Sequence, residues 1–102
     1  MNLNRNFNQE LYTIINNRII TNGFELSKDL QRELKDLIRK GLDNLYPFDD
    51  LTENKITEAK INSLVLADAL LAEGIKKGGI KILDSDTLKK IKNSICPLFP
   101  FC

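Results

Sequence analysis

The chain has 102 residues and an almost even charge balance, with 15 Lys and Arg residues against 14 Asp and Glu residues. A chain of this length forms one core, so residues 1–102 are predicted to be a single domain. The hydrophobic fraction of 42% and the charged fraction of 28% are typical of a globular protein and exclude a disordered or fibrous one. The net charge of +1 provides no general attraction for nucleic acid, so we expect no nucleic-acid partner.

Three further features bear on location. The longest apolar stretch, residues 64–72, is interrupted by Asp68 and is far shorter than the roughly 20 residues of a membrane helix. The start of the chain lacks the apolar block of a secretory signal. The two cysteines, Cys96 and Cys102, both lie in the last seven residues and do not form the distributed pattern of a secreted disulfide scaffold. We therefore expect a cytoplasmic protein without a transmembrane segment, with peripheral contact to the inner membrane face left open.

The first half of the chain predicts two helices. Over residues 6–21, apolar side chains recur three or four residues apart, and the pattern stops at Asn22-Gly23, a pair suited to closing a helix. Over residues 27–45, Ser27 is the predicted N-cap and leucines and isoleucines form a clean stripe opposite a charged face. Pro47 ends this second helix.

The second half predicts two more helices. Residues 53–76 form the third, capped by Thr52 or Thr57, with a stripe consisting of Ile56, Ile61, Leu64, Val65, Leu71 and Ile75. After Gly78-Gly79 and a short extended connection, residues 85–95 form the fourth, capped by Asp84 or Ser85. Because no strand pair is evident, the fold class is all-α: an antiparallel up-and-down four-helix bundle without a sheet, followed by a non-helical tail at 96–102.

The sequence offers little for catalysis. It contains no histidine, the commonest general base near neutral pH and the commonest metal ligand. Two cysteines alone leave a zinc site two ligands short, although a disulfide between them is geometrically conceivable. Carboxylate pairs such as Asp49-Asp50 lie at predicted helix starts, where capping accounts for them. We therefore predict no catalytic, cofactor or metal site and no enzyme activity.

Two features point to binding. Lysines gather around the last connection and last helix, where they form either a solvated face or a contact surface. The tail carries large apolar groups outside any helix, which either dock between helices or form an exposed binding patch. The candidate partner-binding residues are Lys76, Lys77, Lys81, Lys89, Lys90, Lys92, Leu98, Phe99 and Phe101.

The last third also carries a family resemblance. The stretch Leu70-Leu-Ala-Glu-Gly-Ile-Lys-Lys-Gly-Gly-Ile-Lys-Ile, then Asp84-Ser-Asp-Thr-Leu-Lys-Lys-Ile-Lys-Asn-Ser-Ile and a short aromatic tail, resembles the immunity proteins of class IIa (pediocin-like) bacteriocins, especially the enterocin A immunity type. The resemblance covers the whole chain in length and helix layout, but in residue pattern only this last third. Members often end in a tyrosine-rich tail, whereas this chain has Phe99, Phe101 and two cysteines.

The resemblance implies a cytosolic antiparallel four-helix bundle that protects a lactic acid bacterium from its own pore-forming peptide. The implied partner is the membrane component of the mannose phosphotransferase system, in complex with a pediocin-like bacteriocin. The C-terminal half, here the connection at 76–83, the last helix and the tail, would carry specificity for the cognate peptide. We expect the protein to be a monomer.

Two other functions are compatible with the sequence. One is the precursor of a modified peptide, with a helical leader and the core Cys96-Pro-Leu-Phe-Pro-Phe-Cys102. The other is an antitoxin-like regulator that masks a partner through a helix face.

Overall fold

The computed structural model describes residues 3–45, 52–77 and 81–95 and shows an all-α helical bundle. Its helices are α1 (Leu3–Thr21), α2 (Lys28–Leu45), α3 (Glu53–Lys76) and α4 (Ser85–Ile95). Two short strands, β1 (Glu25–Leu26) and β2 (Ile82–Leu83), precede α2 and α4. The molecule is elongated, with principal extents of 43 × 24 × 21 Å.

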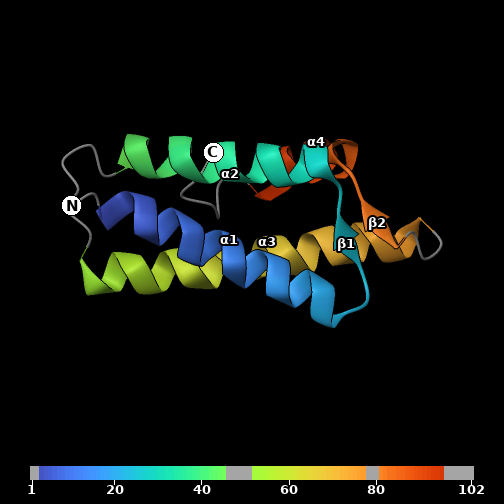
Figure 1. The fold of residues 1–102 in the computed structure, drawn as a ribbon, viewed down its shortest axis with the longest axis horizontal. Coiled ribbons are helices and arrows are strands. Elements are labelled where there is room, and N and C mark those ends of the chain that lie inside the picture. The colour runs from blue at the N-terminus through green and yellow to red at the C-terminus, as the bar shows by residue number, and fades with distance from the viewer. Residues whose placement is uncertain (1–2, 46–51, 78–80, 96–102) are drawn as a thin grey trace.

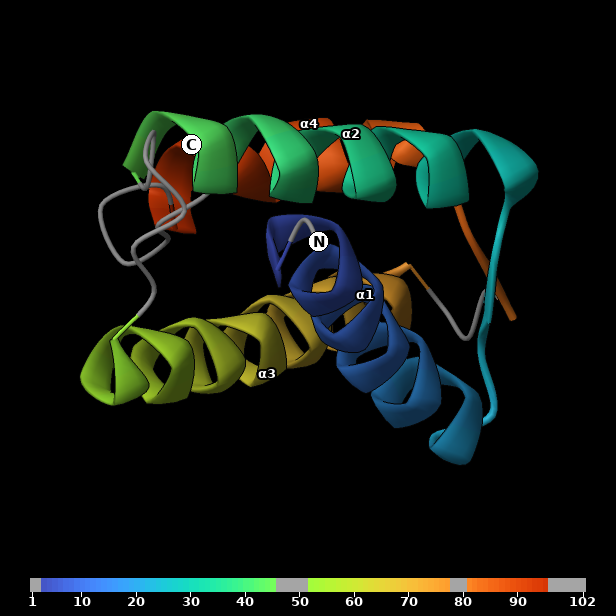
Figure 2. The ribbon, with the colours of Figure 1, turned by 60° about the vertical axis from the view of Figure 1, so that its left-hand side comes forward.

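The chain reverses direction from each helix to the next, as the up-and-down prediction requires. In Figure 1, α1 and α3 run from left to right, whereas α2 and α4 run back. Helix α1 packs against both α3 and α2, and α4 packs against α3 and α2. The two helices that run in the same direction, α1 and α3, therefore lie side by side, and in Figure 2 α1 crosses over α3 beneath the layer of α2 and α4.

The helix ends follow from local capping. Gly23 adopts a positive φ of 87° just after α1, and the Gly23 N–H donates to the Ile20 carbonyl, so the pair Asn22-Gly23 closes the helix as expected. The Leu30 N–H donates to Ser27 Oγ at 3.1 Å, and the Lys55 N–H donates to Thr52 Oγ1 at 3.3 Å. Of the two candidate caps for α3, Thr52 is therefore the one used.

The sequence predicted no sheet, and this prediction was wrong. Strands β1 and β2 pair in parallel, with Glu25 opposite Ile82 and Leu26 opposite Leu83. The Glu25 N–H donates to the Lys81 carbonyl at 2.7 Å, and the Ser27 N–H donates to the Leu83 carbonyl at 2.8 Å. Two residues are too few to show the alternation by which a strand is recognised. The pair holds the starts of α2 and α4 at one end of the bundle (Figure 1).

The core is formed by one face of each helix. In α1 and α2 most buried residues belong to the predicted stripes, including Leu11, Ile15, Leu34 and Ile38, each fully buried. Tyr12 of α1 is also buried, although the predicted stripe did not include it. Among the described residues, the buried apolar ones are Phe7, Leu11, Tyr12, Ile15, Ile19, Leu26, Leu30, Leu34, Ile38, Leu42, Ala59, Leu66, Ala67, Leu70, Leu71, Leu83 and Leu88. No helix in the described ranges is long and apolar enough to cross a membrane.

The stripe predicted for α3 was largely wrong. Ile61, Leu64, Val65 and Ile75 face solvent, with 55%, 39%, 37% and 66% of their surface exposed. The buried face instead consists of Ala59, Ser63, Leu66, Ala67, Leu70, Leu71 and Gly74. Small residues dominate this face because they let α1 and the strand pair approach α3 closely. Between residues 61 and 75, helix α3 therefore carries apolar residues on both faces.

Candidate functional site

The six predicted binding lysines lie in three different settings. Lys77, at the end of α3, donates from Nζ to Thr87 Oγ1 at 3.2 Å. Lys89 and Lys92 line a crevice of about 250 Å³ between α2 and α4. Lys76, Lys81 and Lys90 are exposed. The apolar tail residues proposed for binding, Leu98, Phe99 and Phe101, lie outside the described residues, as do Cys96 and Cys102.

Lys77 belongs to a network that starts α4. Asp84 Oδ1 accepts hydrogen bonds from the Thr87 N–H at 3.1 Å and from the Thr87 hydroxyl at 3.0 Å, so Asp84 is the N-cap of α4. These two bonds from Thr87, together with the positive charge of Lys77, lower the pKa of the Asp84 carboxyl below its ordinary value. The network fixes the end of α3 to the start of α4, which gives Lys77 a structural role.

The crevice between α2 and α4 is lined by charges of both signs. Glu33 and Asp36 of α2 lie on one side, and Lys89 and Lys92 of α4 lie on the other, with Leu37 and Leu88 between them. The remaining lining residue, Lys40, forms an ion pair with Asp36 at 2.9 Å. Helix α4 buries Thr87 and Leu88 against the bundle and leaves Lys89, Lys90 and Lys92 exposed. It therefore presents a basic outer face.

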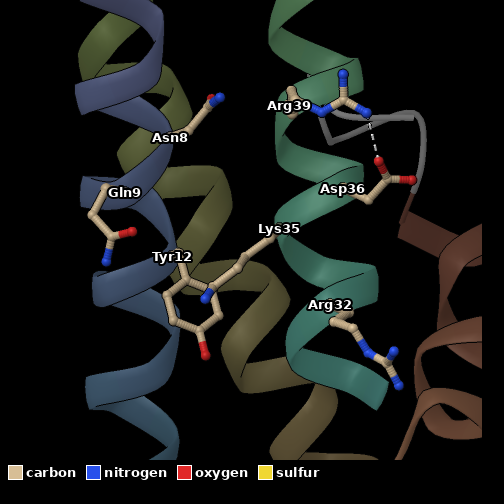
Figure 3. Close-up of a pocket in the computed structure, with 7 residues that line it drawn as sticks. All are labelled: Asn8, Gln9, Tyr12, Arg32, Lys35, Asp36 and Arg39. Carbon is tan, nitrogen blue, oxygen red and sulfur yellow. Dashed lines mark hydrogen bonds and ion pairs between the residues drawn. The ribbon is translucent and has the colours of Figure 1, made fainter. Parts of the chain in front are cut away.

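A second hollow, which the sequence did not predict, lies between α1 and α2. It encloses about 410 Å³ and is lined by Asn8, Gln9, Tyr12, Arg32, Lys35, Asp36 and Arg39. Figure 3 shows Lys35 reaching across to Tyr12, and the Lys35 Nζ lies 4.8 Å from the centre of the Tyr12 ring. This is a cation–π contact between the two helices. The guanidinium groups of Arg32 and Arg39 turn away from that ring (Figure 3).

The charges around this hollow are mostly balanced within α2. Asp36 accepts from Arg39 at 2.8 Å, and hydrogen bonds from Lys40 and Arg39 lower the pKa of its carboxyl. Arg32 pairs with Asp29. Burial raises the pKa of the Tyr12 phenol, which therefore stays protonated at neutral pH. The hollow could hold a carboxylate or phosphate against Lys35.

One polar atom in the hollow has no partner. Asn8 Oδ1 is buried and receives no hydrogen bond within the described part of the chain. The cations of α2 recur as Lys28, Arg32, Lys35 and Arg39, at spacings of four, three and four, which places them on one face of the helix. That spacing is a signal in the sequence for this row. Asn8 and Tyr12 line the hollow only because of the way α1 packs on α2, which the sequence does not reveal.

Comparison with known proteins adds no assignment: no family model, no curated protein and no solved structure matches this chain. Among the described residues, no group of three or more His, Cys, Asp or Glu side chains is arranged to hold a metal ion.

Proposed function

We propose that this protein is a bacteriocin immunity protein, which protects its producer by binding a complex of a pediocin-like bacteriocin and its membrane receptor. The bound face of that receptor, the membrane component of the mannose phosphotransferase system, is the cytoplasmic one. Two observations support the proposal: the all-α four-helix fold that the resemblance implies, and the resemblance of the residues at 70–95.

The observation that carries the proposal is the outer face of α4. This helix has only 11 residues and rests on α3 and α2 through one side, where Leu88 is buried and Ile91 is half-buried. Its exposed lysines have no ion-pair partner among the described residues. A short basic face whose charges the protein itself does not neutralise is suited to an acidic patch on another protein.

The experiment is expression of the chain in a sensitive lactic acid bacterium that is challenged with a panel of pediocin-like peptides. The expected result is a marked rise in resistance to one peptide or a few. Failure to protect against every member of a broad panel, with the protein present and folded in the cells, would overturn the proposal.

A matched pair of variants tests the role of α4. Lys90 and Lys28 are both exposed lysines without an ion-pair partner in the described regions, one on α4 and one at the start of α2. Lys90→Glu should lower protection, whereas Lys28→Glu should leave it unchanged, because only the first reverses charge on the proposed contact surface. Equal protection by both variants would exclude α4 as that surface.

A further inference from the structure

The outer face of α3 differs in chemistry from that of α2. On α2 the solvent-facing positions carry charges that pair within the helix, including Asp29 with Arg32 and Asp36 with Arg39. On α3 the exposed positions between residues 61 and 75 are apolar except for Asp68. These residues, here called the α3 outer stripe, are Ile61, Leu64, Val65, Ala72 and Ile75, all exposed.

The α3 outer stripe is not needed for the core. Ser63, Leu66 and Leu70, which do face the core, are fully buried on the opposite side of the helix. Scattered exposed apolar residues are ordinary, but a row of them along one helix face marks an interaction surface. From these positions we infer that the α3 outer stripe binds a second copy of this chain, with the two α3 helices packed antiparallel in a symmetric homodimer.

The charges at the two ends of the stripe favour a second copy as the occupant. Glu58 and Lys76 lie eighteen residues apart on α3, which is about five full turns, so both lie on the same side of the helix. In an antiparallel pair centred between them, Glu58 of one copy meets Lys76 of the other, and the symmetry repeats this contact. The same register places Val65 near Ala69 of the second copy.

The centre of the stripe carries one acid, and its charge is already compensated. Asp68 accepts from Arg18 Nε of α1 at 3.0 Å and from a second Arg18 nitrogen at 3.4 Å. The two-fold axis would bring the two Asp68 carboxylates toward each other near the centre of the contact. Each carboxylate arrives with its own Arg18, so the repulsion between the acids is offset.

A bilayer fits this surface less well than a second copy. A helix that lies on an anionic membrane carries lysines and arginines along the border of its apolar face. The border here carries Glu58 as well as Lys76, a balanced pair rather than a basic set. The homodimer replaces the monomer expected from the sequence and is independent of the proposed function.

The first test is sedimentation of the purified chain over a range of about 1 to 500 µM. A contact made by one helix from each copy is small, so we expect a reversible dimer with a dissociation constant in the micromolar range. Ile61→Asp should weaken the dimer more than tenfold. Ile20→Asp is the matched control, because Ile20 is 54% exposed, close to the 55% of Ile61, but lies on α1. Circular dichroism of both variants would establish that they fold.

The second test exchanges the end charges. Glu58→Lys alone and Lys76→Glu alone should each raise the dissociation constant about three- to tenfold, because each places like charges opposite one another twice. The double variant E58K with K76E should restore it. A wild-type protein that remains monomeric throughout the range, a dimer unaffected by Ile61→Asp, or a double variant without recovery would each overturn the inference. Flotation with phosphatidylglycerol vesicles that requires Ile61, with a monomer in solution, would also overturn it.

Discussion

Gly74 of α3 lies directly against Leu83 of β2, so closely that a Cβ at position 74 would come within 2.7 Å of Leu83 Cδ2. The same Cβ would lie 3.1 Å from Cε1 of Phe24, which precedes β1. Leu83 is 1% exposed, so its side chain is packed within the core. The lack of a side chain at position 74 is therefore what lets the strand pair lie on the end of α3.

Gly74→Ala should destabilise the protein, although alanine is the better helix former. The gain in helix propensity is about 1 kcal/mol, whereas forcing an extra methyl group into a filled site costs about 1–3 kcal/mol. We expect a net loss of up to about 2 kcal/mol in the free energy of unfolding, measured by urea denaturation. Because the loss arises from Leu83, the double variant with Leu83→Ala should lose less than the sum of the two single changes. Additive losses would contradict the contact.

The orientation of α3 predicts a large difference between two neighbouring leucines. Leu66 is fully buried, whereas Leu64 is 39% exposed on the α3 outer stripe. Leu66→Ala removes core contacts and leaves a cavity, which should cost about 2–5 kcal/mol. Leu64→Ala should cost less than about 1 kcal/mol when measured at low concentration, where the proposed dimer would be dissociated. Similar losses for the two variants would show that α3 is turned differently.

Prediction from sequence succeeded at the helix ends and failed for the core face of α3. The caps at Ser27 and Thr52 and the turn at Gly23 were predictable, because each depends on residues within one turn of the helix end. In α2 the core face was predictable because the other face is charged. In α3 both faces carry apolar residues, so helical spacing alone could not identify the core face, and the predicted stripe included Ile61.

The remaining differences concern contacts between distant segments. The pairing of Leu26 with Leu83 joins positions far apart in the chain, and nothing in either two-residue strand indicates the other. The hollow between α1 and α2 depends likewise on the approach of Tyr12 to Lys35, which the sequence spacing of each helix does not fix. Local signals therefore predicted the helices and most of their ends, whereas the sheet and the hollow required the packed structure.

Tyr12 should titrate above its ordinary pKa of 10.0, because its burial opposes the charged phenolate. A folded-state pKa above the unfolded one means that the stabilisation is complete below pH 10.0 and is lost as the pH rises through the raised value. The measurement is alkaline titration of tyrosine absorbance in the wild type and in Tyr12→Phe. The variant retains only Tyr46, so the difference between the two titration curves reports Tyr12 alone. A difference curve centred at or below 10.0 would contradict the burial.

The protein should lose stability in acid as the carboxylate of Asp84 becomes protonated. This carboxyl has a pKa below the ordinary value of 3.8, first because of the hydrogen bond from the Thr87 N–H and then because of that from the Thr87 hydroxyl. A folded-state pKa below the unfolded one means that the stabilisation is present above pH 3.8 and is lost as the pH falls through the lowered value. Asp84→Ala should therefore cost about 1 kcal/mol at neutral pH, the usual effect of removing an N-cap.

Asp84→Asn separates the charge from the cap, because asparagine caps a helix about as well as aspartate but does not ionise. This variant should be close to the wild type at neutral pH and should lose less stability between about pH 5 and pH 2.5, measured by urea denaturation at each pH. Asp86→Asn, in the first turn of α4 but not at the cap, is the matched control for the removal of one carboxylate from this end of the helix. An acid dependence of Asp84→Asn that equals that of the wild type would mean that the hydrogen bonds from Thr87 do not stabilise the charged carboxylate.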